Sequence, residues 1–283
     1  MNNKRLPRFT IVTPSFQKAK FIEQAIQSVL FQDYPNVEHI ILDGGSTDGT
    51  VEILKKYSHL TWLSEPDEGQ VAALNKGITM AKGEIIGVLN ADDYYEKRAF
   101  QTALRIFQQR SDVSVLVGNC RIVDQDGKTL VFNRPRVRLE ELLQPWRYHF
   151  PVNPSAYFYR KKLHSVVGWY QERHGVAFDY EFLLRLASKT KFFYLDQVLG
   201  NFRYYGETKA HQNRDHNLSD QIAISKEYWG EGWKRFFSVY QWSYFGFLFI
   251  PQLRKGVNSF QRFRSKVAFR TRLRRAMKKT AKL

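Results

Sequence analysis

Cysteine is almost absent from this sequence, because its 283 residues include only Cys120. A single cysteine excludes an internal disulfide framework and fits a protein of a reducing compartment. Cys120 ends the apolar segment 113–120, so we expect a small buried side chain on a strand rather than a reactive thiol.

Two kinds of long hydrophobic run are also missing. Near the N-terminus, Pro7 and Arg8 interrupt the apolar stretch that a secretion signal requires, which predicts a cytoplasmic protein. The most apolar stretch, residues 236–250, is shorter than the about 20 residues that a helix needs to cross a bilayer. We therefore expect no spanning helix and no export channel of the kind found in processive polymerases.

Acidic residues are missing from the C-terminal segment. Residues 232–283 hold 14 of the 44 Lys and Arg residues and no Asp or Glu, which leaves 30 basic and 27 acidic residues in 1–231. The net charge of +17 therefore belongs mainly to this segment. Such asymmetry predicts that one end of the molecule contacts an anionic surface.

What the sequence does contain is a regular alternation of strand and helix patterns. With 43% hydrophobic residues the chain can bury a large core. Hydrophobic periodicity predicts strands at 9–16, 37–45, 60–66 and 84–93, and helices at 21–32, 50–57, 70–83 and 97–110. This order indicates an α/β fold with a mainly parallel sheet and helices on its faces.

Polar segments follow four of these strands, at 13–16, 43–50, 65–70 and 90–93. Each one alone is more typical of a helix cap or a solvated turn. In an open α/β sheet, however, ligands bind where the loops after the strands converge. Their joint placement predicts one crevice, into which Asp43 would present an acceptor for a ring N–H of a bound base.

The adjacent Asp92 and Asp93 come directly after an apolar strand, where repulsion and desolvation both oppose ionisation. A capping turn is the simpler interpretation. The alternative is a divalent cation, since magnesium or manganese held by one or two carboxylates completes its shell with phosphate oxygens. The segment 90–93 therefore suits a metal diphosphate.

Taken together, four stretches resemble the family 2 glycosyltransferases over roughly residues 8–205. They are "IVTPSF", "ILDGGSTDGTVEI", "SEPDEGQVAALNKGITMAKGEIIGVLNADDYY" and, much later, "FDYEFLLRLA". The resemblance implies the GT-A fold, a Rossmann-like mixed and mainly parallel sheet flanked by helices. It also implies inverting sugar transfer from a nucleotide-diphosphate donor with a divalent cation, manganese or magnesium.

The resemblance also assigns residues to the donor site. It places Thr13, Pro14 and Ser15 along the nucleotide pocket, Asp43 at the base, Asn75 and Lys76 near the donor, and Asp92 on the metal with Asp93 beside it. Asn90 stands where many members have a first aspartate. Its amide carbonyl is a weaker, neutral metal ligand or a ribose contact.

A single inverting displacement needs a carboxylate that takes the proton of the acceptor hydroxyl. Asp179 matches the family's Glu-Asp element at the start of a helix, with Phe178 in place of the first acid. Glu181 is the competitor, but two residues along a helix it points about 200° away. The alternative for both is an acid at a helix start that the helix dipole stabilises. With the resemblance, we predict that Asp179 is the base.

The segment 139–175 is aromatic and basic, as expected of a surface that stacks on sugar rings or pairs with phosphate. Its histidines, His149, His164 and His174, lack metal-ligand spacing. A later loop containing Arg203, His211 and His216 is a candidate to close over the donor diphosphate, although a solvated loop has the same composition.

We divide the chain into a GT-A domain at 1–225 and a helical, basic extension at 226–283. Within the domain, residues 8–120 would bind the nucleotide and 121–225 would form the acceptor side. In the extension, 236–250 suits a membrane interface and 254–282 would face anionic headgroups. The alternatives are a helix packed on the core or on a second subunit, followed by a disordered tail, and, least favoured, nucleic acid.

The sequence thus predicts a peripheral glycosyltransferase on the cytoplasmic face of the cell membrane. Its expected acceptor is a polyprenyl-diphosphate-linked saccharide of surface polysaccharide assembly. A non-catalytic binding or scaffold protein is the alternative, disfavoured because Asp43, Asp92, Asp93 and Asp179 are all present. A nucleotidyltransferase is also disfavoured, since "TPSFQKAK" is not a glycine-rich phosphate loop. A homo-oligomer remains compatible with the sequence.

Overall fold

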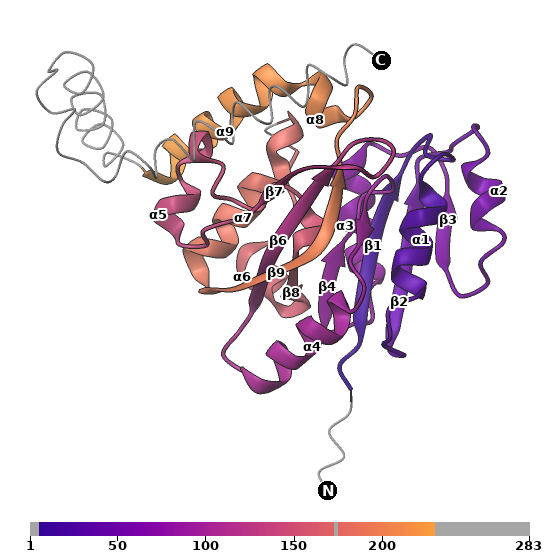
Figure 1. Cartoon of the computed structure of the whole chain (residues 1–283), viewed down its shortest axis with the longest axis horizontal. Coiled ribbons are helices and arrows are strands. Elements are labelled where there is room, and N and C mark those ends of the chain that lie inside the picture. Colours follow the sequence, from indigo (N-terminus) through magenta and orange to yellow (C-terminus); the bar gives the residue numbers. More distant parts are fainter. Residues whose placement is uncertain (1–5, 173–174, 230–283) are drawn as a thin grey trace, which may run out of the picture.

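The computed structural model describes residues 6–172 and 175–229, which form one sheet with helices on both faces (Figure 1). The strands are β1 (Phe9–Ser15), β2 (Val37–Asp43), β3 (Thr61–Ser64), β4 (Ile85–Val88), β5 (Tyr94–Tyr95), β6 (Val115–Val123), β7 (Thr129–Asn133), β8 (Tyr157–Arg160) and β9 (Phe192–Arg203). The α-helices are α1 (Ile22–Leu30), α2 (Thr50–Leu54), α3 (Gln70–Met80), α4 (Ala99–Gln109), α5 (Leu139–Leu142), α6 (His164–Val167), α7 (Phe178–Lys189), α8 (Lys209–Gln212) and α9 (Arg214–Trp229). Short 3-10 turns lie at Pro145–Arg147, Pro154–Ala156, Lys161–Leu163 and Gly175–Ala177.

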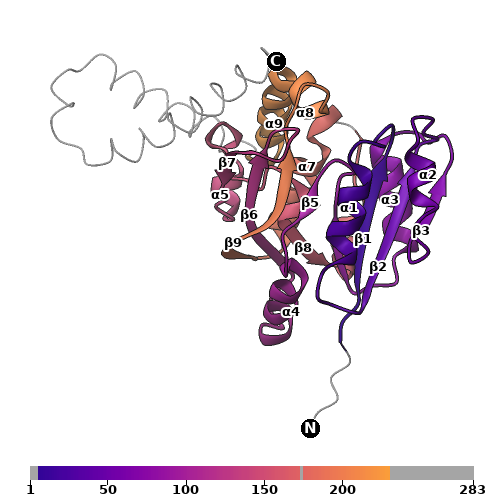
Figure 2. The ribbon, with the colours of Figure 1, turned by 45° about the vertical axis from the view of Figure 1, so that its right-hand side comes forward.

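The first half of the sheet is parallel, as the sequence predicts. Its strand order is β3-β2-β1-β4, and β1 pairs with β2 in a register that ends with Ser15 opposite Asp43. Because these strands end level, the loops after them start from the same edge. Figure 2 shows this half, with α1, α2 and α3, at the right of the molecule.

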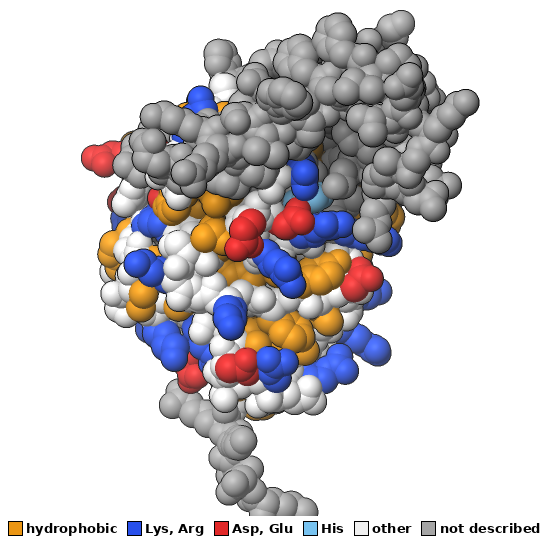
Figure 3. All heavy atoms as spheres, turned by 90° about the vertical axis from the view of Figure 1, so that its left-hand side faces the viewer, with side chains coloured by type: hydrophobic (Ala, Val, Ile, Leu, Met, Phe, Trp, Pro, Cys, Tyr) orange, Lys and Arg blue, Asp and Glu red, His pale blue; other side chains and the backbone are white. Residues whose placement is uncertain are grey.

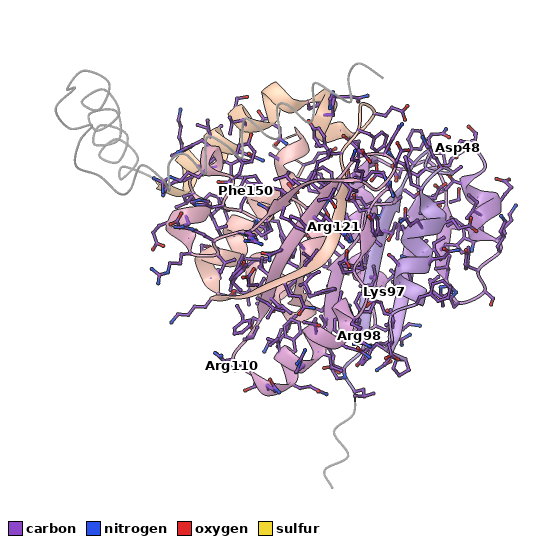
Figure 4. All side chains as sticks on the ribbon, in the orientation of Figure 1. Asp48, Lys97, Arg98, Arg110, Arg121 and Phe150 are labelled. Atoms are coloured by element: carbon purple, nitrogen blue, oxygen red, sulfur yellow. The ribbon has the colours of Figure 1, made fainter. Side chains whose placement is uncertain are left out.

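The second half of the sheet is mixed. Strand β8 is antiparallel to both β4 and β6, β6 is parallel to β9, and β5 and β7 pair at its margins. Arg121 of β6, labelled in Figure 4, donates to the Asn201 carboxamide of β9 at 2.6 Å and also pairs with Glu96. Because β4 of the first half pairs with β8 of the second, the two halves form one continuous sheet.

Apolar side chains alternate along β1 and so reach both faces of the sheet. Val12 packs with α3 and α7, whereas Phe9 and Ile11 pack with α1 and α4. At Gly77 of α3, a Cβ would lie 2.5 Å from a Val12 methyl carbon. Only glycine lets this helix approach the strand so closely.

The C-terminal helix of the described part packs on α7. The Tyr180 hydroxyl lies 2.7 Å from the Ser225 hydroxyl, and Ile224 is fully buried in the same cluster. The predicted domain boundary between 225 and 226 therefore falls inside α9. No helix within the described ranges is long and apolar enough to span a membrane. His174 and the segments 236–250 and 254–282 lie outside the described residues.

Candidate active site

A cleft of about 1380 Å³ opens where the loops after β1 to β4 meet the second half of the sheet. Each of the four predicted polar segments contributes to its lining, through Ser15, Gly44, Pro66 and Asp92 among others. The prediction that these strand ends share one crevice is confirmed. The opposite wall comes from β9, α7, α8 and the segment 148–154.

Side chains of the first two loops hold each other in place. The Gln17 backbone N–H donates to the Ser46 hydroxyl at 2.8 Å, and the Ala19 N–H donates to the Asp48 carboxylate at 2.9 Å. Burial raises the pKa of Asp48, but hydrogen bonds from Thr50 and from backbone N–H groups outweigh this effect. The pKa of Asp48 therefore lies below its usual value. The loops after β1 and β2 are thus interlocked (Asp48 in Figure 4).

Of the three residues predicted for the nucleotide pocket, Pro14 and Ser15 line the cleft. The Ser15 hydroxyl is buried and has no hydrogen-bond partner within the described ranges, so it has a free donor and acceptor capacity at the cleft wall. Thr13 is fully buried instead, and its hydroxyl lies 2.9 Å from Nε2 of the buried His39. Thr13 therefore supports β1 from inside.

Asp43 sits at the end of β2 with 2% of its surface exposed. Its carboxylate accepts hydrogen bonds from the Ser46 N–H at 2.8 Å, the Ser46 hydroxyl at 2.6 Å and the Ser64 hydroxyl at 2.7 Å. Three donors occupy most of its roughly four acceptor positions. Asp43 fixes the β2 and β3 loops here, and base binding by it stays a prediction.

Asn75 and Lys76 lie on α3 outside the lining of the cleft. The Asn75 amide donates to the Tyr170 carbonyl at 3.0 Å and accepts from the Tyr170 N–H at 3.1 Å. Lys76 pairs with Glu65 on the surface. In this structure Asn75 anchors the segment before residue 172, and a position near the donor stays a prediction for both residues.

Asp93 is buried behind the cleft and holds three partners. It accepts from the Arg203 N–H at 2.8 Å, the Asn90 amide at 2.9 Å and the Asn153 amide at 2.7 Å. Burial, followed by the charge of Asp92, raises its pKa despite these donors. Asn90 in turn accepts from Gln70 at 3.1 Å. Both polar groups of Asn90 are therefore used within the protein.

Asp92 faces the cleft and binds Lys18, which the sequence did not predict at this site. Its Oδ2 lies 2.9 Å from Lys18 Nζ and 3.0 Å from the Tyr205 hydroxyl, and Lys18 Nζ also donates to that hydroxyl at 3.0 Å. Burial and, after it, the negative charge of Asp92 raise the pKa of Tyr205 to about 12. Asp92, Lys18 and Tyr205 thus form a closed triangle.

The residues present do not form a metal site of their own. No group of three or more His, Cys, Asp or Glu side chains in the described part of the chain could hold a metal ion. Asn90 and Asp93 are bonded to protein partners, and Asp92 is paired with an ammonium. Asp92 as a metal ligand stays a prediction.

Arg203 lies behind Asp92 rather than over the cleft. Only 3% exposed, it donates from Nε to the Asp92 carbonyl at 3.0 Å and from NH1 to the Gln125 carbonyl at 2.6 Å. These contacts hold the loop that carries the two aspartates. The ring of His211, from the same predicted loop, packs at 5.3 Å from the Tyr204 ring and is outside the cleft lining. A role for either residue over the diphosphate stays a prediction.

Asp179 lines the opposite side of the cleft at the start of α7. Its carboxylate is part-buried and accepts from the Tyr180 N–H at 2.7 Å. Removal from water raises its pKa to about 6, and the backbone hydrogen bonds oppose this rise only in part. A carboxylate with such a pKa suits general base catalysis near neutral pH.

Glu181 has a different environment. It is 1% exposed, and its carboxylate accepts from Arg185 Nε at 2.8 Å and from the Tyr228 hydroxyl at 2.9 Å. It is absent from the lining of the cleft. The buried ion pair with Arg185 ties α7 internally, so Glu181 has a structural position.

Aromatic side chains line the wall on the Asp179 side. They include Tyr148, Phe150, Phe178, Phe202 and Tyr204. The segment 139–175 was expected to be an aromatic surface, but β9 residues were not assigned to it. On the face of this half shown in Figure 3, Lys and Arg side chains are spread among hydrophobic ones. The wall offers ring faces of the kind that stack on sugars.

Comparison with known proteins places the chain. Residues 10–167 match the profile of the family described as "Glycosyl transferase family 2". A chondroitin synthase of Pasteurella multocida is 27% identical over 227 residues, which are 78% of this chain and 23% of that protein. The chain thus spans about a quarter of that synthase's length.

Two solved structures share the fold. Staphylococcus aureus TarS in complex with UDP-GlcNAc has a TM-score of 0.59 at 20% identity, over 77% of this chain and 66% of that one. The mannosyltransferase PcManGT from Pyrobaculum calidifontis, in complex with GDP-Man and Mn²⁺, also has a TM-score of 0.59, at 19% identity over 78% and 64%. With the family match covering more than half of its length, the chain belongs to glycosyl transferase family 2 and has the GT-A fold.

Proposed function

We propose that this protein transfers a sugar from a nucleoside-diphosphate donor to a hydroxyl of a saccharide acceptor, with inversion at the anomeric carbon. Two observations support the donor. Pro14, Gly44 and the Ser15 hydroxyl, which has no hydrogen-bond partner among the described residues, line the cleft. Structural neighbours of the same fold hold UDP-GlcNAc and GDP-Man.

Asp179 is the proposed base. Its carboxylate takes the proton of the acceptor hydroxyl while that oxygen forms a bond to the anomeric carbon. The bond from that carbon to the diphosphate oxygen breaks, and its electron pair leaves with the nucleoside diphosphate. A pKa of about 6, raised by burial, keeps Asp179 ionised and basic at neutral pH. Glu181 is not the proposed base, because its carboxylate already accepts hydrogen bonds from Arg185 and Tyr228.

The observation that carries the proposal is that Asp179 and the four strand-end loops line the same cleft. They come from opposite halves of the sheet and are more than 80 residues apart in sequence. A base on one wall and a nucleotide on the other leave the space between them for the sugar. The aromatic wall beside Asp179 suits the acceptor.

The acceptor we propose is a saccharide of surface polysaccharide synthesis, linked to a polyprenyl diphosphate. A relative named a chondroitin synthase supports the saccharide part. The aromatic segment 236–250 and the basic segment 254–282 support attachment to the cytoplasmic face of the membrane. In this proposal the transferase domain, predicted at 1–225, also includes the rest of α9 to residue 229, because Tyr228 donates to Glu181, and the segments 236–250 and 254–282 form the attachment.

Manganese or magnesium, predicted from the sequence, would have to be held by Asp92 together with the donor phosphates. The proton passes from the acceptor hydroxyl to Asp179, and this step uses no metal ligand. A test of the function therefore needs arms with Mn²⁺, with Mg²⁺ and with a chelator.

The full chain would be incubated with a panel of UDP- and GDP-sugars and with chondroitin oligosaccharides or a polyprenyl-diphosphate-linked saccharide as acceptors. Release of nucleoside diphosphate and the mass of the product are measured. We expect release from one donor class, acceptor-dependent and nearly lost in Asp179→Asn, while calorimetry still shows donor binding by that variant. Binding of no nucleotide in any arm would refute the proposal.

A further inference from the structure

The cleft contains a cation held in a fixed position by Asp92. Lys18 lies in the loop between β1 and α1, and its backbone N–H donates to the Thr50 hydroxyl at 3.0 Å. Its side chain is 24% exposed, lines the cleft and lies between Asp92 and Tyr205. Its Nζ also lies 5.5 Å from the centre of the Tyr205 ring.

We propose that Lys18 binds the diphosphate of the donor and takes the place that a divalent cation would occupy on Asp92. This inference rests on the proposed function, because it names the group that meets the donor's phosphates. Asp92 then positions Lys18, and Tyr205 holds both of them. The ligand class is a nucleoside diphosphate or its sugar ester.

The Lys18 ammonium has an N–H group available for a phosphate oxygen. Lys18 Nζ carries three N–H groups, of which one points to Asp92 Oδ2 and one to the Tyr205 hydroxyl. Within residues 6–172 and 175–229 the third N–H has no partner, which leaves it for a phosphate oxygen in the cleft. Burial lowers the pKa of Lys18, but Asp92 and Tyr205 outweigh this effect and raise it above its usual value, so the group stays charged.

Acidic side chains outnumber basic ones in the lining of the cleft, so an anionic ligand has few positive partners there. Five acidic residues of the described chain line it: Asp67, Asp92, Glu172, Asp179 and Glu207. The basic residues of the same lining are Lys18 and Lys209. Lys209 is exposed and reaches Gln70 at 3.4 Å, whereas Lys18 is held by a carboxylate and a phenol. An anionic diphosphate therefore finds its best-defined positive partner at Lys18.

A divalent ion and Lys18 compete for the same carboxylate. A metal on Asp92 would have to displace the ammonium from Oδ2 or lie next to it, where like charges repel. Asp93 and Asn90 are not open as additional metal ligands, since Asp93 accepts from Asn153 and Asn90 accepts from Gln70. The arrangement favours the ammonium.

Calorimetric binding of UDP and of GDP to the full chain tests the inference, with EDTA and, separately, with Mn²⁺. We expect the better of the two nucleotides to bind in EDTA, with Mn²⁺ changing its Kd less than threefold. Lys18→Met, which keeps the side-chain length and removes the charge, should weaken binding in EDTA at least tenfold. Lys20→Met is the matched control, because Lys20 is exposed in the same loop and outside the cleft lining.

Tyr205→Phe provides a second variant, since it removes one hydroxyl from the triangle and leaves the charge. It should weaken binding in EDTA by about three- to tenfold, and circular dichroism checks that both variants are folded. Binding that requires Mn²⁺ and is equal or tighter in Lys18→Met would overturn the inference and leave the transferase proposal standing. Absence of binding by the wild type with and without Mn²⁺ would overturn both.

Discussion

The two walls of the cleft are built in different ways. Behind the wall of strand-end loops, polar side chains bond to one another, as Asp43 does to Ser46 and Ser64. The wall around Asp179 is aromatic, with Phe150 and Phe202 among its lining residues. Figure 4 labels one residue from each side, Asp48 in the loop between β2 and α2 and Phe150 in the segment 148–154.

From this difference we infer that the strand-end loops keep one geometry and that the aromatic wall selects among sugars. Hydrogen-bonded loops keep one geometry, as a diphosphate shared by many donors requires. Ring faces tolerate sugars of several shapes and add contact area rather than a fixed pattern. We therefore expect substitutions on the two walls to affect different kinetic constants, and the predictions below test that separation.

The largest effect should come from Asp179→Asn. The amide cannot take the acceptor proton, so kcat should fall by about 10²- to 10⁴-fold, the usual range for general base catalysis. Nucleotide affinity should be unchanged, because Asp179 lies on the wall opposite the strand-end loops. Steady-state transfer assays and calorimetry measure the two quantities. A parallel loss of nucleotide affinity would contradict the separation of the walls.

Glu181→Gln should act on stability instead. It leaves the mostly buried Arg185 without its charged partner, and breaking a buried pair in this way costs roughly 3 to 5 kcal/mol. Chemical denaturation gives the change in the free energy of unfolding. The kcat of the folded fraction should stay within about twofold of the wild type. A kcat loss as large as that of Asp179→Asn would exchange the roles of the two acids.

The pH dependence of transfer should report Asp179. The active form is the carboxylate, whose pKa burial raises to about 6. Activity should therefore increase with pH and be about tenfold higher at pH 7 than at pH 5. Profiles of kcat/KM across this range measure the midpoint. The residual activity of Asp179→Asn should show no midpoint near pH 6. A midpoint retained in that variant would assign the titration to another group.

Much of the first half of the fold could be predicted from sequence, for a physical reason. Each strand and helix there is continuous in the chain, so hydrophobic periodicity predicts its type and its order predicts parallel pairing. The expected helix 70–83 is α3, Gln70–Met80, and the expected strand 84–93 contains β4, Ile85–Val88. In the second half, β6 pairs with β8 and β9 from distant segments, which periodicity alone does not reveal.

The site divides in the same way. Ser15, Asp92 and Asp179 could be assigned because they occupy motif positions, and all three line the cleft. Lys18 follows the first motif by two residues and could have been found by extending the loop, but its pairing with Asp92 depends on side-chain direction. Tyr205 and Asn153 give no sequence signal, since their contacts with Asp92 and Asp93 are made only by the folded chain.

The smallest predicted effect concerns the aromatic wall. Phe202 of β9 lines the cleft, with its ring 5.8 Å from that of Tyr204. Aromatic contacts of this kind contribute about 0.5 to 1.5 kcal/mol, so Phe202→Ala should raise the acceptor KM by about 2- to 12-fold. Donor KM should stay the same, because the strand-end loops are untouched.

Phe132→Ala is the matched control, since Phe132 is 44% exposed on β7 and outside the cleft lining. It should leave both KM values unchanged. Thermal melting of the two variants separates lost packing from lost acceptor contact. If Phe202→Ala instead raises the donor KM and leaves the acceptor KM alone, the aromatic wall binds the donor sugar, and the two walls must be assigned in the opposite sense.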